Sequence, residues 1–413
     1  MYRVLLLSTA ALIAGCATNP VPDSPRETAY TVPDDVSYAW ATFDKDGIVN
    51  SDTSGLADRR TGRALTLDDP VRIASISKLV LTLGVMKLVE QGQLDLDQDV
   101  SEILGWDVRN PKFPDTPITL RHLLSHTSSL MDDGVNYGVR LGVPLQDVAG
   151  APDVYDPHHA PGTYFQYANL NFPVVASIME RVTGERMDTL MQRLVFEPLS
   201  MDACFNWTTC SDDTISKAVV LYKLNGQVYL DDRRGNRPDC PVRVKAGLAC
   251  NLNDYVPGEN GALFSPQGGL RISIRDLTTV GELLLNEGQI DGERFLEAQS
   301  IREMQTPQWI YDGTNGNTSG ETVGEQDNGF YCTYGLATQI VPTHTPGCAD
   351  DVGKGESWSG HAGDAYGLRS GLWVDMDQGT GITYFAINNG DAPQKGDSYY
   401  RAIEEYLAAN HED

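Results

Sequence analysis

The stretch VRIASISKLVLTLGVMKLVEQG, residues 71–92, decides the fold of this chain. Residues 71–74 are typical of a short strand, and the apolar residues that follow recur at helical spacing until a glycine ends the pattern. The sequence therefore predicts a strand that leads directly into a helix over residues 75–91. Ser75 and Lys78 lie three positions apart in the first turn of that helix, so the lysine ammonium comes within reach of the serine hydroxyl.

Two further patterns accompany this Ser-x-x-Lys motif, which on its own is also compatible with a helix-capping serine and a solvated lysine. Among nine lysines only Lys78 has a serine three positions before it, and among 18 tyrosines only Tyr167 has an asparagine, Asn169, two positions after it. Among seven histidines only His361 is followed two positions later by a glycine, Gly363. Three unique patterns in this order indicate one catalytic constellation.

With these motifs the chain resembles the class C β-lactamase-like serine hydrolases, which include penicillin-binding DD-peptidases, D-aminopeptidases and esterases with a β-lactamase fold. The motifs of that family are Ser-x-x-Lys, Tyr-x-Asn, and Lys-Thr-Gly or a variant such as His-x-Gly. Residues 120–130 (LRHLLSHTSSL) are similar to the family segment LLxHTSGL, and residues 92–97 (GQLDLD) and 266–270 (PQGGL) extend the resemblance. The resemblance implies an α/β fold of the β-lactamase/transpeptidase type. In this fold helices flank an antiparallel sheet built from both termini, and a mostly helical lobe is inserted.

The resemblance also implies a mechanism, acyl transfer through a covalent intermediate on Ser75. Lys78 and Tyr167 would share the removal of the serine proton, with the choice of general base left open, and Tyr167 would protonate the leaving group. Asn169 would hydrogen-bond the substrate amide. The oxyanion hole would consist of the backbone N–H groups of Ser75 and Asp364.

His361 narrows the expected activity, because β-lactamases usually carry at this position a lysine that attracts a carboxylate, whereas histidine is largely neutral at pH 7. We therefore expect a serine hydrolase of the DD-peptidase or D-aminopeptidase kind, acting on small amide, peptide or ester substrates. A carboxylesterase is the alternative within the class, and a true β-lactamase is less favoured. Gly363 and Asp364 are expected to contact the substrate, and the charge of Asp364 favours a substrate with a free amine. A catalytically idle binding lipoprotein of the envelope is the alternative from another class.

The N-terminus predicts export. Arg3 precedes an apolar run that is too short to span a bilayer, which is typical of a signal peptide over residues 1–15. The run ends in Leu-Ile-Ala-Gly-Cys, which resembles a bacterial lipobox. The resemblance implies that Cys16 is lipidated, and Ala17 after it favours the periplasmic face of the outer membrane. An ordinary signal peptide cleaved nearby is the alternative.

The rest of the chain divides into a tether and one catalytic domain. Residues 16–34 are rich in Pro, Ser, Thr and Asp and predict a flexible tether. Residues 35–410 form the expected catalytic domain, with the helical lobe at about 93–265. Specificity is expected to depend on the loops around 131–165, 204–260 and 305–330. The pattern predicts strands over 36–43, 335–341, 366–374 and 381–388, and helices over 120–126, 172–183, 187–196, 276–287 and 398–409.

The composition limits the partners. With 31 basic and 57 acidic side chains the chain has a net charge of −26, which argues against nucleic-acid binding and leaves the lipid as the means of membrane attachment. No motif implies a cofactor, and His158 with His159 beside Asp156 is more typical of a polar loop than of a metal site. The expected partner is a small-molecule or short-peptide substrate, and the sequence does not indicate the oligomeric state.

Apart from Cys16 the chain has six cysteines, an even number that is typical of disulfides in an exported protein. A structural zinc site is the alternative, but no CxxC motif or His/Cys cluster supports it. The grouping of the cysteines suggests three local pairs, Cys204–Cys210, Cys240–Cys250 and Cys332–Cys348.

Overall fold

The computed structural model describes Met1 and residues 30–132, 136–319, 329–390 and 394–412, and one compact unit spans Val32–Asp413. The predicted signal peptide, Cys16 and most of the predicted tether lie outside the described residues. Within the described residues no helix is long and apolar enough to cross a bilayer.

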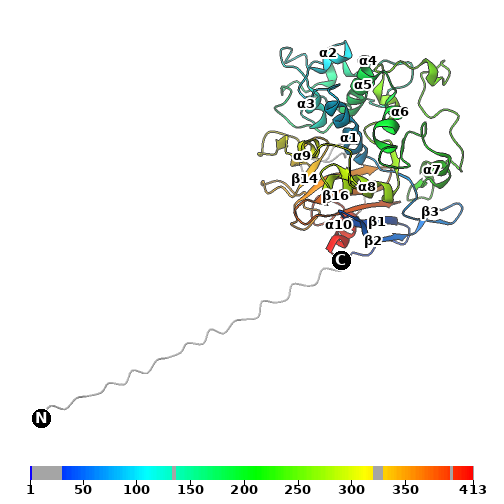
Figure 1. Cartoon of the computed structure of the whole chain (residues 1–413), viewed down its shortest axis with the longest axis vertical. Helices are drawn as coiled ribbons and strands as arrows, with labels where there is room; N and C mark the ends of the chain where they lie inside the picture. Colours follow the sequence, from blue (N-terminus) through cyan, green and yellow to red (C-terminus); the bar gives the residue numbers. More distant parts are fainter. Residues whose placement is uncertain (2–29, 133–135, 320–328, 391–393, 413) are drawn as a thin grey trace. The chain divides into compact units, whose positions relative to one another are not determined.

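An eight-stranded antiparallel sheet occupies the lower part of this unit in Figure 1, in the order β12-β13-β14-β15-β16-β17-β1-β2. Strand β1 (Ser37–Asp44), near the N-terminus, pairs with β17 (Thr380–Ile387), near the C-terminus, with Ala39 opposite Phe385. Both ends of the chain therefore build the sheet, which confirms the predicted fold class. The other strands are β2 (Gly47–Ser54), β12 (Trp309–Ile310), β13 (Thr333–Tyr334), β14 (Gln339–Val341), β15 (Trp358–Ala365) and β16 (Leu368–Asp375).

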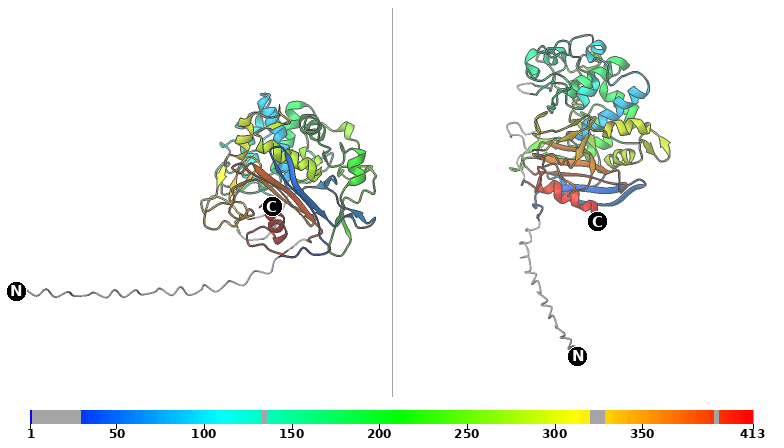
Figure 2. Two further views of the ribbon diagram at one scale, coloured as in Figure 1. Left: turned by 60° about the horizontal axis from the view of Figure 1, so that its bottom comes forward. Right: turned by 90° about the vertical axis from the view of Figure 1, so that its left-hand side faces the viewer.

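Helices cover both faces of the sheet (Figure 2). On β17, the hydroxyl of Thr383 lies 3.2 Å from that of Thr278 in α8 (Ile274–Leu285). The next residue, Tyr384, points to the opposite face, because side chains alternate along a strand, and α10 (Ala402–Ala408) packs there. Covered on both faces, β16 is buried along its whole length.

Between β5 (Val71–Arg72) and β9 (Leu270–Ile272) the chain forms the helices in the upper part of Figure 1. Helix α1 (Ile76–Glu90) is buried on nearly all sides, as expected for a helix between this helical part and the sheet. The other helices of this part are α2 (Val100–Leu104), α3 (Leu120–Leu124), α4 (Gln146–Ala149), α5 (Asn171–Thr183), α6 (Met187–Met191) and α7 (Asp212–Lys217), with a π-helical turn at Gln192–Phe196 and 3₁₀ turns at Pro152–Val154, Leu252–Asp254 and Gly261–Phe264. The segment between β5 and β9 also contains the short strands β6 (Cys204–Phe205), β7 (Leu221–Tyr222) and β8 (Val228–Leu230). Before this segment come β3 (Leu56–Asp58) and β4 (Arg63–Ala64), and after it come β10 (Gln289–Ile290), β11 (Glu293–Arg294) and α9 (Ala298–Gln305).

The structure differs from the predicted elements mainly near the C-terminus. The strand predicted over 335–341 is wrong as a single element, because β13 and β14 flank a turn at which Ala337 has a φ of +50°. Strand β15 was not predicted, because its sequence WSGHAGDA has two glycines and no β-branched residue. It forms nevertheless because it pairs with a strand on each side, with Gly360 opposite both Gln339 and Trp373.

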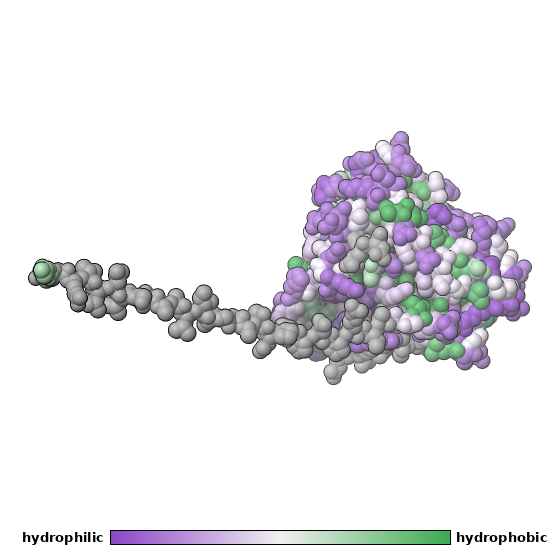
Figure 3. Space-filling view, turned by 90° about the horizontal axis from the view of Figure 1, so that it is seen from below, coloured by the Kyte–Doolittle hydropathy of each residue, from purple (hydrophilic) through white to green (hydrophobic). Residues whose placement is uncertain are grey.

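The cysteines form the three predicted local pairs, Cys204–Cys210, Cys240–Cys250 and Cys332–Cys348. Each bond closes a short loop, with sequence separations of 6, 10 and 16 residues. The face of the molecule in Figure 3 is mostly hydrophilic, with hydrophobic residues in small scattered groups, as expected for a strongly acidic protein.

Candidate active site

Ser75 lies at the junction of β5 and α1, where it is the N-cap residue of the helix. Ala74 before it has a φ of +55°, in the left-handed region that residues other than glycine rarely adopt. Ser370 of β16 supports this turn, because its hydroxyl donates to the carbonyl of Ile73 at 3.0 Å. Backbone strain of this kind persists where the surrounding contacts enforce it, and it is common at functional sites.

The Lys78 side chain is fully buried and donates to three oxygen atoms. Its Nζ lies 2.9 Å from Ser75 Oγ, 2.9 Å from Asn169 Oδ1 and 2.8 Å from the carbonyl oxygen of Gln267. These three acceptors match the three N–H groups of an ammonium, which is how a buried charge is tolerated. Nζ also lies 4.9 Å from the centroid of the Tyr167 ring. The structure thus brings Ser75, Lys78, Tyr167 and Asn169 together.

Tyr167 is held between two other rings. The His126 ring stacks on one face at 4.2 Å between centroids, and the Tyr331 ring stacks on the other at 4.5 Å. His126 Nδ1 accepts hydrogen bonds from the backbone N–H of Ala168 at 3.1 Å and from Asn171 Nδ2 at 3.0 Å. Burial, and then the charge of Lys78, holds the pKa of His126 well below its ordinary value, so the ring is neutral and able to accept.

His361 is fully buried in β15, with 6.4 Å between its ring centroid and that of Tyr167. Burial, with a smaller contribution from the charge of Lys78, lowers its pKa from 6.5 to about 3, so it is neutral at pH 7. Its Nδ1 faces the carbonyl oxygen of Ala362, which assigns the proton to Nδ1. Nε2 then accepts from the Tyr334 hydroxyl at 2.8 Å.

Gly363 lies where β15 passes the turn before Ser75. A Cβ at this position would lie 2.6 Å from the carbonyl oxygen of Ile73 and 2.3 Å from Ser370 Oγ, so no side chain fits. Asp364, the next residue, forms an ion pair with the buried guanidinium of Arg369. The negative charge that favoured an amine-bearing substrate is therefore balanced within the protein.

Asp132 is a residue of the site that sequence reasoning missed. Its carboxylate accepts from the backbone N–H of Asn169 at 2.6 Å, from Asn169 Nδ2 at 3.1 Å and from the backbone N–H of Leu170 at 3.0 Å. Because Nδ2 is turned toward Asp132, the amide oxygen Oδ1 of Asn169 faces Lys78. Burial raises the pKa of Asp132, although these hydrogen bonds oppose the shift. Asp132 and Asn169 are 37 positions apart, and no local sequence pattern indicates that they meet.

Tyr331 and Tyr334 were also missed. They belong to the segment FYCTY, residues 330–334, whose middle cysteine forms the Cys332–Cys348 disulfide. The concentration of aromatic residues around a cysteine was the available signal, but it is equally typical of a hydrophobic core. The disulfide thus constrains the segment that supplies contacts to both Tyr167 and His361.

Where the structure describes the chain, no group of three or more His, Cys, Asp or Glu residues is arranged to hold a metal ion. His159 instead lies with Nδ1 2.6 Å from Asp156 Oδ2, and its ring stacks on Tyr164 at 3.8 Å.

The antiparallel sheet, the helical part and the buried Ser-x-x-Lys pair at their junction define a fold of the β-lactamase/transpeptidase type. Residues 34–406 match the Beta-lactamase family, and the chain belongs to that family. Members of the family are serine hydrolases and include esterases, DD-peptidases and D-amino acid amidases.

Two curated relatives show the range of the family. The chain is 34% identical over 170 residues to Esterase EstB of Burkholderia gladioli, covering 36% of this chain and 42% of the relative. It is 27% identical over 263 residues to Penicillin-binding protein 4 of Amycolatopsis lactamdurans, covering 63% of this chain and 62% of the relative. The chain thus spans less than two thirds of the length of either relative.

Among solved structures, the D-amino acid amidase of Ochrobactrum anthropi SV3 is similar, with a TM-score of 0.61 and 18% identity over 91% of this chain and 92% of the amidase. The beta-lactamase/D-alanine carboxypeptidase of Pseudomonas syringae has a TM-score of 0.60 and 18% identity over 91% of this chain and 94% of its own. At this identity the likeness concerns the fold.

Proposed function

We propose that this chain is a serine hydrolase that forms an acyl-enzyme on Ser75. One observation carries the proposal: the buried Lys78 Nζ lies 2.9 Å from Ser75 Oγ at a helix N-terminus. A serine hydroxyl becomes an effective nucleophile only beside a group that takes its proton, and a lysine in contact with it can do so. As an ammonium Lys78 has no free lone pair, so in its role as base it starts from the neutral amine and accepts the Ser75 hydrogen bond.

The reaction proceeds in two halves. The proton of Ser75 passes to the Lys78–Tyr167 pair while Oγ attacks the substrate carbonyl carbon, and the resulting oxyanion receives hydrogen bonds from the backbone N–H groups of Ser75 and Asp364. Tyr167 returns a proton to the leaving amine or alcohol as the bond to the carbonyl carbon breaks. Water then attacks the acyl-enzyme by the same route and releases the acid, which restores Ser75.

For the substrate we propose small amides, peptides or esters of the kind that DD-peptidases and D-aminopeptidases hydrolyse, with carboxylesterase activity as the alternative. The names of relatives, which include an esterase and a D-alanyl-D-alanine carboxypeptidase, support both the peptidase and the esterase activity. The buried, neutral His361 supplies no cation for a carboxylate, which disfavours efficient β-lactamase activity. Asn169 would contact the substrate amide, and the backbone of β15 at Gly363 would contact the substrate.

The test is a hydrolysis panel of a p-nitrophenyl ester, a D-amino-acid amide, a D-Ala-D-Ala peptide and a cephalosporin. We expect turnover of an ester or amide, and loss of that turnover in Ser75→Ala. Ser216→Ala, at an exposed serine of α7, is the matched control and should retain full activity. Turnover that persists in Ser75→Ala would contradict the assignment. Absence of turnover and of covalent labelling would favour the idle binding lipoprotein.

We also propose that the chain is exported and held in the bacterial envelope, at the periplasmic face of the outer membrane, through lipid on Cys16. The three disulfides support export, since such bonds persist in oxidising compartments. The expected result for Cys16→Ala is release from the membrane fraction and loss of the lipid mass from the N-terminal peptide. Retention in the membrane would contradict the anchor.

A further inference from the structure

A cavity of about 840 Å³ lies beside the proposed nucleophile. Gln267, whose carbonyl oxygen accepts from Lys78, and Arg72, three residues before Ser75, both belong to its wall. Gly268, the next residue after Gln267, packs against the turn that carries Ser75, since a Cβ there would lie 3.7 Å from the backbone of Ala74. Through Gln267 and Arg72 the cavity therefore adjoins the segments that hold Lys78 and Ser75.

The cavity wall is positively charged, in a chain whose net charge is −26. Its charged residues are four arginines and two aspartates. Asp231 pairs with the buried Arg271 at 2.6 Å, and Asp232 Oδ2 pairs at 3.2 Å with Arg234, which is not part of the wall. The buried Oδ1 of Asp232 lies 4.0 Å from Arg60 and accepts no hydrogen bond among the described residues. Among the described residues, the other three arginines of the wall form no ion pair: Arg72, Arg233 and Arg243.

Two of these arginines of the same cavity wall keep hydrogen-bond donors that no described residue uses. Arg233 Nε is buried and has no hydrogen-bond partner among the described residues, which costs free energy unless a ligand accepts from it. Arg72 uses Nε to donate to the carbonyl of Gly268 at 2.8 Å. Burial above all lowers the pKa of Arg271, and the charges of Arg72 and Arg233 lower it further while Asp231 opposes them. The three guanidinium groups thus belong to one wall of the cavity, together with the carboxylates of Asp231 and Asp232.

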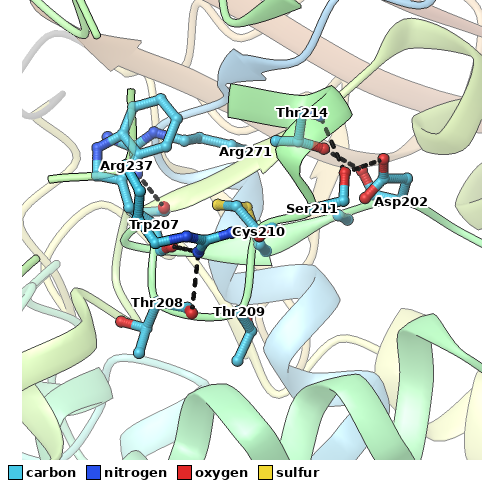
Figure 4. Close-up of a disulfide and its surroundings, with 12 residues drawn as sticks. Asp202, Trp207, Thr208, Thr209, Cys210, Ser211, Thr214, Arg237 and Arg271 are labelled. Atoms are coloured by element: carbon cyan, nitrogen blue, oxygen red, sulfur yellow. Dashed lines mark hydrogen bonds between the residues drawn. A yellow bond between two sulfur atoms is a disulfide. The ribbon is translucent and has the colours of Figure 1, made fainter. Parts of the chain in front are cut away.

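Aromatic rings complete the wall. The Trp207 ring lies 3.9 Å from the guanidinium of Arg271, and the Tyr366 ring lies 5.0 Å from the guanidinium of Arg72. Figure 4 shows how Trp207 is held: it belongs to the loop closed by Cys204–Cys210, and Arg237 donates to the carbonyls of Trp207 at 3.0 Å and Cys210 at 2.7 Å. The wall is thus built before any ligand binds.

We propose that this cavity binds the acyl part of the substrate and selects acyl groups that carry a carboxylate next to a planar or apolar body. Arg233 and Arg72 would bind the carboxylate, and Trp207 and Tyr366 would contact the body. The proposal rests on the proposed function, because the acyl group reaches the cavity from Ser75. It also reverses the expectation of an amine-bearing substrate, since Asp364 is paired with Arg369.

The test uses two esters of equal shape, the p-nitrophenyl esters of 4-carboxyphenylacetic acid and of 4-carbamoylphenylacetic acid. We expect the carboxylate ester to have a kcat/KM about tenfold higher, the effect of one charge-assisted hydrogen bond. Arg233→Gln should remove this preference by lowering kcat/KM for the carboxylate ester about tenfold relative to the carbamoyl ester, whereas Arg233→Lys should retain part of the preference. Arg140→Gln, which removes the same charge from an exposed residue outside the cavity, should retain it fully.

A binding measurement separates failure of this proposal from failure of the proposed function. Calorimetry with 4-carboxyphenylacetamide and its carbamoyl analogue uses the Ser75→Ala protein, which needs no turnover. Tighter binding of the carboxylate, lost with Arg233→Gln, supports the cavity even if neither ester is hydrolysed. Equal affinity for the two compounds, equal kcat/KM for the two esters, or an equal loss in Arg140→Gln would overturn the proposal.

Discussion

Lys78 links three parts of the site through its side chain. Its three hydrogen bonds join the nucleophile, the Tyr-x-Asn turn and the segment at Gln267, which come from three separate parts of the chain. The orientation of Asn169 is therefore as important as its presence, because only its oxygen can accept from the ammonium. Asp132 sets that orientation through the Nδ2 group.

Asp132→Asn is expected to lower kcat about 10²-fold, because the new amide N–H₂ faces N–H donors and Asn169 must turn or shift. Asp132 acts as a positioning residue, so the substrate affinity of the Ser75→Ala protein should change much less than kcat does in the active enzyme. The measurement is kcat on a neutral p-nitrophenyl ester, with thermal unfolding to confirm that the variant folds. A kcat within twofold of wild type would contradict this role.

His361 should make the protein less stable in acid. Its pKa is about 3 in the folded chain and near 6.5 when unfolded, so between these values the unfolded chain binds a proton that the folded chain does not. The free energy of unfolding then falls by about 1.4 kcal/mol for each pH unit below 6.5 from this group alone. In the His361→Gln variant no group titrates at this position. The difference between wild type and variant in the free energy of unfolding, measured with denaturant at each pH, therefore isolates the effect. A difference that stays constant from pH 4 to 8 would contradict the buried neutral imidazole.

At the scale of the elements, the site is the place where β15 closes on the turn between β5 and α1. The hydroxyl of Ser370 in β16 donates a hydrogen bond to the carbonyl of Ile73. Gly363 of β15 lies so close to the same carbonyl that a side chain would not fit between them. The sheet thus fixes the entry of α1, and through it the position of Ser75.

Gly363→Ala is expected to destabilise the protein by about 1–3 kcal/mol and to lower kcat at least tenfold, because its methyl group would push β15 away from Ile73. Ala365→Ser, a small change in the same strand, is the control and should have little effect. Denaturant unfolding and ester hydrolysis measure the two quantities. Full activity in Gly363→Ala would show that the close approach is unnecessary.

The sequence predicted the elements whose patterns are local. The helix from Ser75 onward could be predicted because its apolar spacing is regular, and the sheet built from both termini followed from strand-like segments and from the resemblance. Strand β15 could not, because its pairing partners rather than its own residues make it a strand. The contacts of Tyr331, Tyr334 and Asp132 escaped prediction for the same reason, since each depends on which distant segments meet.

At the scale of the whole molecule, two of the three disulfides close loops that carry residues of the proposed site and of the cavity beside it. Cys332–Cys348 constrains the segment of Tyr331 and Tyr334, whereas Cys204–Cys210 closes the loop of Trp207. An acidic chain with short disulfide loops can keep the active-site surroundings ordered while its surface remains strongly hydrated.

The double variant Cys332→Ser/Cys348→Ser is expected to lose about 3 kcal/mol of stability and most of its activity on a neutral ester, because Tyr167 and His361 lose ordered neighbours. Cys240→Ser/Cys250→Ser is the comparison, since the ring contacts to Tyr167 among the described residues come from outside its loop. Because Cys240 lines the cavity, the ester used has a small acyl group, and on it this variant should lose stability but keep kcat. Unfolding curves and kcat measure both. Equal kcat in the two double variants would show that the disulfide acts on stability alone.

The central claim is that Ser75 is a nucleophile activated by Lys78. It is tested most directly by treating the folded protein with a fluorophosphonate and locating the adduct by intact-mass and peptide mass spectrometry. We expect one adduct, on the peptide that contains Ser75. It should be absent in Ser75→Ala and should form much more slowly in Lys78→Met. No adduct under native conditions, or an adduct on another serine of the folded protein, would contradict it.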